Sequence, residues 1–193
     1  MILETDGVKE LVNSVVRRAM SGDQYAFNQL FRRYERPLRS FLHGVTGRWG
    51  ATDDLVQETF SRAFQLLPDL RDESKFSTWI FGIAKNVALE ACRRQSLSHE
   101  RVEWDHYDVQ TLCDSSLNPE SAMIKGEFYK AVGRGFSLLD EDSRTMLALR
   151  VFAEKKYSEI AEITGWSLPK VKIEIYRARL KMREILAPHL RRK

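Results

Sequence analysis

Apolar residues recur every three or four positions along most of the sequence, the spacing that places them on one face of an α-helix. Breaks interrupt this pattern after residue 20 and over residues 44–50, and a polar loop interrupts it over residues 68–75. No segment shows the sustained alternation of apolar and polar residues that indicates a half-buried strand. The pattern therefore predicts an all-α fold.

The first half of the sequence predicts a series of helices with one apolar face each. A short helix ends at Ser21-Gly22-Asp23, a longer one runs to about His43, and two more span residues 52–67 and 76–94. Thr52 is expected to cap the third of them. The expected core positions are Leu11, Val15, Ala19, Phe27, Leu30, Phe31, Tyr34, Leu38, Phe41, Leu55, Val56, Phe60, Ala63, Phe64, Leu67, Trp79, Ile80, Ile83, Ala84 and Val87.

Residues 95–121 carry few periodic apolar residues and many acidic or small polar ones, so they predict a linker. The next helix begins near Asn118-Pro119-Glu120 and runs to about Phe136. Asp140 is expected to cap another helix. The apolar positions expected to be buried there are Met146, Leu147, Leu149 and Val151.

Residues 157–183 predict two helices joined by a tight turn. Ser158 is a good N-cap for the first helix, and Gly165 supplies the left-handed residue that ends it. Ser167 caps the second, with Pro169 in its first turn. Its apolar side is Val171, Ile175 and Ala178, and its basic residues are Lys170, Lys172, Arg177, Arg179, Lys181 and Arg183. This pattern is typical of a DNA-reading helix-turn-helix, although an ordinary helical hairpin with a solvated basic face shares it.

Charge is distributed unevenly along the chain. Residues 13–98 carry a net charge of +4 and residues 123–193 of +7, whereas residues 99–122 carry −5. Basic blocks favour a polyanionic partner, and a sharp change of sign indicates a domain boundary. The expected divisions are a helical domain over residues 1–95, a flexible acidic linker over residues 96–121 and a second small helical domain over residues 122–193.

The composition argues against several classes of protein. No apolar run approaches the length that spans a bilayer, and the start MILETDGVKE does not resemble a signal peptide, so a cytoplasmic protein is expected, with no membrane insertion. Cys92 and Cys113 form no disulfide framework. The four histidines lack metal-ligand spacing, and no phosphate loop or nucleophile elbow is present. We therefore expect no catalytic residue, no metal and no cofactor, and hence not an enzyme.

Short motifs in both halves of the chain resemble a known family. They are DLVQETF at residues 54–60, FSTWI at 76–80, IAKN at 83–86, SEIA at 158–161, VK at 171–172 and YRAR at 176–179. The first three resemble region 2 of bacterial sigma factors, and the others resemble region 4. Their order and spacing identify the chain as a member of the sigma-70 family, in the small extracytoplasmic-function (ECF) group that keeps only these two domains.

This resemblance implies a transcription initiation factor. Such a factor joins core RNA polymerase, guides it to a promoter and opens the duplex there. The implied partners are the clamp of the largest polymerase subunit, the flap of the second subunit, promoter DNA and an anti-sigma factor that holds the protein inactive. The acidic linker would then occupy a channel later taken by nucleic acid, although a solvated tether would have the same composition.

The resemblance implies that the helix around residues 54–60 docks on the polymerase clamp. Asp54, Gln57 and Glu58 lie at i, i+3 and i+4, so one helical face offers carboxylate and amide acceptors to arginine. The alternative is that the acids only complement the helix dipole, a role that Asp53 also fills. The candidate polymerase-binding residues are Asp53, Asp54, Gln57 and Glu58.

The helix over residues 76–94 and the loop before it resemble the part that melts and captures the −10 element. Capturing a base costs a few kcal/mol of unstacking, which charged contacts and an aromatic surface can offset. Asn86 occupies the position where related factors contact the flipped base. Trp79 is either a core residue or a second stacking surface. The candidate −10 residues are Lys75, Phe76, Ser77, Asn86, Arg93 and Arg94, with Phe76 as the stacking ring.

The second helix of the helix-turn-helix is expected to enter the major groove of the −35 element. Arg177 can pair with a guanine in a bidentate manner, and Lys170 can contact phosphate. Glu174 either accepts a hydrogen bond from cytosine or pairs with Lys170. The candidate −35 residues are Lys170, Lys172, Ile173, Tyr176, Arg177 and Arg179. A two-domain regulator that binds duplex DNA without polymerase is the rival hypothesis.

Overall fold

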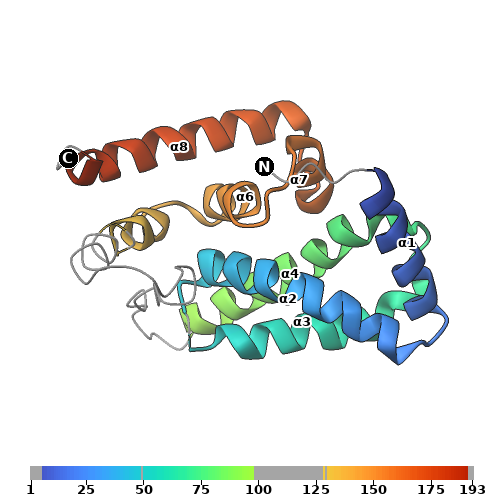
Figure 1. The fold of residues 1–193 in the computed structure, drawn as a ribbon. Helices are drawn as coiled ribbons and strands as arrows, with labels where there is room; N and C mark the ends of the chain where they lie inside the picture. The colour runs from blue at the N-terminus through green and yellow to red at the C-terminus, as the bar shows by residue number, and fades with distance from the viewer. Residues whose placement is uncertain (1–5, 49, 98–127, 129, 191–193) are drawn as a thin grey trace, which may run out of the picture.

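The computed structural model describes residues 6–48, 50–97, 128 and 130–190 (Figure 1). Within these ranges every regular element is a helix, so the prediction of an all-α fold is confirmed. The linker expected at residues 96–121 lies almost entirely outside the described residues, because α4 ends at Leu97 and description resumes at residue 128. None of the described helices is long and apolar enough to cross a membrane.

The N-terminal part is a helical bundle. Its elements are α1 (Asp6–Met20), α2 (Gln24–Thr46), α3 (Thr52–Leu66), the 3-10 turns η1 (Leu67–Asp69) and η2 (Glu73–Lys75), and α4 (Phe76–Leu97). Asp23 begins α2, since its carboxylate accepts hydrogen bonds from the backbone N–H groups of Tyr25 and Ala26 at 2.9 and 3.1 Å. Gly47, with φ of 72°, ends the same helix in the left-handed conformation.

Aromatic rings fill the centre of the bundle. The rings of Phe31 and Phe60 lie 4.5 Å apart, which joins α2 to α3, and those of Tyr34 and Phe76 lie 5.3 Å apart, which joins α2 to α4. The largest deeply buried side chains of this part are Leu30, Leu38, Phe41, Leu42, Leu67, Phe76, Ile80 and Phe81. The helical periodicity predicted most of this core.

Three of the expected core positions are wrong. Leu11 is 66% exposed, because the face of α1 toward α2 is centred on Val16 and Ala19. Phe64 and Val151 lie in the last turns of α3 and α6 and are also largely exposed. Near the end of a helix, neighbouring elements cover the apolar face less completely.

Two of the expected N-caps are also wrong. The hydroxyl of Thr52 donates back to the carbonyl of Arg48 at 2.5 Å, and no side chain caps α3. Helix α7 (Tyr157–Thr164) begins one residue before Ser158, and the Glu159 carboxylate accepts from the backbone N–H of Lys156 at 2.7 Å. At α7 the Glu159 carboxylate takes the place of the expected hydroxyl, whereas at α3 the Thr52 hydroxyl is used by the preceding loop.

The C-terminal part contains a helical segment over residues 130–137, α6 (Glu141–Val151), α7 and α8 (Leu168–Leu190). Asp140 caps α6 as predicted, accepting from the N–H of Ser143 at 2.9 Å. Gly135 allows the first segment to approach α8, because a Cβ there would lie 2.6 Å from the sulfur of Met182. The core between these helices is formed by Met146, Leu149, Ile160, Val171, Ile175 and Ala178.

The two parts pack directly against each other, with α6 on α2 and α7 on α4 (Figure 1). Gly44 of α2 makes room for the ring of Phe152, since a Cβ there would lie 2.5 Å from its Cε2 atom. Arg144 of α6 donates to the carbonyls of Leu139 at 2.8 Å and Val45 at 3.3 Å. The sequence predicted the helices on each side of this contact but not the contact itself.

Candidate functional site

The helix-turn-helix forms as the sequence predicted. Gly165 ends α7 with φ of 75°, and its N–H donates to the carbonyl of Ala161 at 2.9 Å. Val171, Ile175 and Ala178 are buried, so the opposite side of α8 faces solvent. The exposed residues on that side include all six −35 candidates, Lys170, Lys172, Ile173, Tyr176, Arg177 and Arg179. The structure therefore places them together on one exposed surface, the basic face of α8.

Two contacts orient the cations of this basic face. Arg177 forms an ion pair with Glu174 at 3.0 Å, and the ammonium of Lys170 lies 3.1 Å from the centre of the Trp166 ring. Of the alternatives for Glu174, an ion pair does form, but its partner is Arg177 and not Lys170. Trp166 was not among the candidates, although its position four residues before Lys170 was the available signal.

The four polymerase-binding candidates lie near the start of α3, in two different environments. Asp54 and Gln57 are exposed. Asp53 forms an ion pair with Arg39 of α2 at 2.5 Å, and Glu58 forms one with Arg62 at 2.7 Å. Counting only the described residues, half of the expected acceptors therefore point to solvent without an ion pair to another side chain.

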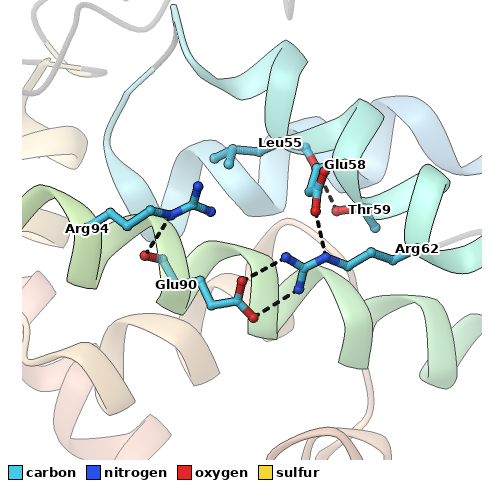
Figure 2. A network of polar contacts seen from close by, with 6 residues as sticks. All are labelled: Leu55, Glu58, Thr59, Arg62, Glu90 and Arg94. Atoms are coloured by element: carbon cyan, nitrogen blue, oxygen red, sulfur yellow. Dashed lines mark hydrogen bonds and ion pairs between the residues drawn. The ribbon is translucent and has the colours of Figure 1, made fainter.

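Glu58 belongs to a network that joins α3 to α4. Figure 2 shows Arg62 between two carboxylates: its Nε donates to Glu58, and its two terminal nitrogens donate to Glu90 at 2.9 and 2.8 Å. The bidentate geometry is the stronger form of an arginine–carboxylate pair. These hydrogen bonds raise the pKa of Arg62 and lower the pKa of Glu90. Arg62 and Glu90 were not predicted, because they lie 28 residues apart in sequence.

The −10 candidates divide between the core and the surface of α4. Asn86, Arg93 and Arg94 are exposed. Lys75 and Ser77 contact the C-terminal part: Lys75 pairs with Glu162 at 2.6 Å, and Ser77 accepts a hydrogen bond from Lys155 at 2.5 Å. The structure thus leaves Asn86, Arg93 and Arg94 exposed on α4, whereas Lys75 of η2 and Ser77 in the first turn of α4 contact the C-terminal part.

The expectation that Phe76 offers a stacking ring to a −10 base is wrong for this structure, because the ring is buried. The side chain is 1% exposed and packs against Tyr34 and Trp79. Trp79 is partly buried and packs on the same core, which agrees with the core alternative stated for it. Phe76 is the first residue of α4, so the expected position on a loop-to-helix junction was right and its exposure was not.

No chemistry beyond binding stands out among the described residues. They contain no group of three or more His, Cys, Asp or Glu side chains that could hold a metal ion. Cys92 is a free thiol, and burial raises its pKa, so its reactive thiolate is disfavoured at neutral pH. Cys113 lies outside the described residues.

Comparisons with known proteins match the two halves of the chain to one family. Residues 30–97 match the family Sigma-70 region 2, and residues 130–182 match the family Sigma-70, region 4. The chain is 32% identical to the ECF RNA polymerase sigma-E factors of Salmonella typhimurium and Escherichia coli, over 92% of its length and 95% of theirs. The corresponding factor of Haemophilus influenzae is 33% identical over 86% of this chain and 90% of that protein.

Solved structures show the same fold. CnrH, solved in complex with the cytosolic domain of CnrY, superposes with a TM-score of 0.70 at 25% identity, covering 92% of this chain and 97% of that one. RpoE of Bartonella quintana, solved with the anti-sigma factor NepR, superposes at 0.65 and 22% identity, over 83% of this chain and 96% of that one. The matched families, the relatives and the two surfaces together show that this chain is a promoter-directing sigma factor of the ECF group of the sigma-70 family.

Proposed function

We propose that this sigma factor binds core RNA polymerase through the exposed start of α3, reads the −35 element with α8 and captures the −10 element with α4. The observation that carries this assignment is the placement of two chemically opposite surfaces on opposite sides of the fold (Figure 1). The acceptors Asp54 and Gln57 lie on α3, and the basic face lies on α8. Acceptors suit the arginines of a protein partner, and cations suit DNA phosphates.

The function requires core polymerase, so we propose that the protein acts in the cytoplasm without catalytic activity of its own. The deciding experiment is run-off transcription with core enzyme, with and without this chain, over a library of promoter DNA. We expect specific transcripts only when both are present. If no template responds and the isolated chain binds duplex DNA tightly and specifically, the protein is instead a regulator that works without polymerase.

We further propose that a protein inhibitor controls this factor. The support is that CnrH, similar over nearly the whole chain, was solved with the cytosolic domain of a second protein. An inhibitor of this kind must compete with polymerase or DNA for the surfaces described above. We therefore expect an inhibitor identified by affinity capture to lower run-off transcription, and excess core enzyme to restore it.

Arg177 is expected to read one base pair of the −35 element. Its side chain is exposed near the middle of α8 and forms an ion pair with Glu174. This ion pair restricts the guanidinium before binding and so reduces the conformational entropy that the side chain loses on binding DNA. Changing Arg177 to alanine should cost about 1–3 kcal/mol at one position of the element, measured by competition among single-base variants in the presence of core enzyme. Lys170→Ala, the expected phosphate contact, is the control and should weaken all variants alike. Equal weakening by Arg177→Ala would make it a phosphate contact.

A further inference from the structure

The loop that leads from η1 into α4 is anchored at three side chains. Leu70 and Phe76 are buried at its two ends, and Glu73 is half-buried between them. The other side chains of the loop are exposed, namely Arg71, Asp72, Ser74 and Lys75. Glu73 is therefore the polar side chain through which the middle of this loop is attached to the bundle.

The attachment point is Arg17, in the last turn of α1. Its Nη2 donates to Oε1 of Glu73, although the two residues lie 56 positions apart in the sequence. Helix α1 also packs along both η1 and η2. The Arg17–Glu73 ion pair thus fixes the loop to the first helix of the chain.

The end of α1 that carries Arg17 is itself held in place. The neighbouring Arg18 donates through two nitrogens to the Asp23 carboxylate at 2.9 and 2.5 Å. That carboxylate also caps α2, as described above. The hydroxyl of Ser21 donates to the carbonyl of Arg17 at 3.1 Å, which closes the turn between the helices. Arg17 therefore extends from a backbone position that is fixed relative to α2.

The loop is shaped so that Glu73 is available to Arg17. Asp72 accepts hydrogen bonds from the N–H and the hydroxyl of Ser74 at 2.9 and 2.6 Å, and these bonds begin η2 at Glu73. The hydrogen bond from Arg17 lowers the pKa of Glu73, so the carboxylate stays charged at neutral pH. Asp72 thus shapes the turn locally, whereas Glu73 determines where the turn lies on the bundle.

We propose that Arg17 is a positioning residue for the −10 element, which acts through Glu73 to hold the exposed side chains of residues 71–75 where they meet single-stranded DNA. The proposal rests on the proposed function, which assigns α4 and the preceding Lys75 to that element. An exposed loop without such an attachment would lose more conformational entropy on binding DNA. Arg17 itself need not touch the DNA.

Reversing the charge of Arg17 tests this proposal in the complex with core enzyme. Arg17→Glu places two carboxylates opposite each other, so promoter opening, followed by permanganate reactivity of unpaired thymines, should become about three- to tenfold slower. Formation of the complex with core enzyme, and its binding to a duplex that ends before the −10 element, should not change. Arg32→Glu, exposed on α2, makes the same change of charge elsewhere and should open promoters normally.

A charge exchange distinguishes positioning from direct contact with DNA. The double variant Arg17→Glu, Glu73→Arg restores an ion pair with its charges reversed, and we expect it to recover most of the opening rate. If Arg17 contacted a phosphate, the exchange would not restore opening, and the proposal would fail. Glu73→Gln keeps the size of the side chain while removing its charge, so it should slow opening less than Arg17→Glu does. Equal slowing by Arg32→Glu would attribute the effect to net charge and overturn the proposal.

Amide hydrogen exchange of the isolated chain provides a measurement without polymerase. Arg17→Glu should speed exchange in residues 70–75, and the charge exchange should slow it again, because the ion pair lies beside these amides. Unchanged exchange in Arg17→Glu would refute the attachment of the loop. If the natural chain opened no promoter with core enzyme, the proposed function would fail instead, whatever the exchange of the variants.

Discussion

A chain that carries both Asp54→Lys and Gln57→Lys is expected to bind core RNA polymerase at least about 100-fold more weakly, since like charges placed opposite each other at an interface cost several kcal/mol. Both side chains are exposed on α3 and lie outside the Glu58–Arg62–Glu90 network. The melting temperature should therefore stay within a degree or two of that of the natural chain, because surface substitutions away from such features change stability little. Binding is measured by titrating labelled chain with core enzyme.

Two variants separate docking from folding in this experiment. Glu10→Lys, on the exposed side of α1, controls for most of the change in net charge, since it adds +2 where the double variant adds +3, and it should bind normally. Glu58→Lys removes a partner of Arg62, so it should lower the melting temperature as well as binding. Normal binding by the Asp54 and Gln57 double variant would remove α3 from the docking surface.

Replacing Phe76 with alanine is expected to lower the free energy of unfolding by about 3–5 kcal/mol, the usual cost of deleting a large buried aromatic ring. The ring is 1% exposed and contacts α2 through Tyr34. Because a natural domain has only about 5–15 kcal/mol of stability, this loss should be visible as a large shift in the urea midpoint. Phe76→Leu keeps most of the buried volume and should lose less.

The same measurement distinguishes the core role of Phe76 from base stacking. If Phe76 stacked on a −10 base, the Phe76→Ala chain would lose promoter opening while its urea midpoint stayed unchanged. Phe76→Leu should retain run-off transcription if the ring only fills the core, because the fold around Lys75 and Ser77 is then preserved. Loss of promoter opening in a fully stable Phe76→Ala chain would restore the stacking assignment.

The sequence alone determined the helices and their inward faces, because these depend on residues close together in the chain. Val171, Ile175 and Ala178 were predicted to be buried on one side of the recognition helix, and they are. Gly165 and Asp140 were predicted to end and begin helices, and both do so through local hydrogen bonds. The motifs likewise predicted the family, since each lies within a single helix or turn.

Tertiary structure alone decided which of the candidate side chains face solvent and which contact other helices of the chain. The spacing of Glu58 and Asp54 places both on one helical face. The structure shows, however, that Glu58 accepts a hydrogen bond from Arg62, which also donates to Glu90 of α4. Spacing placed Phe76 beside Lys75, but Tyr34 of α2 buries the ring. Lys155 contacts Ser77 from 78 residues away, a partnership that no local pattern encodes. Local periodicity fixes a helix and its apolar face, whereas the partner of each polar group depends on which distant helices pack together.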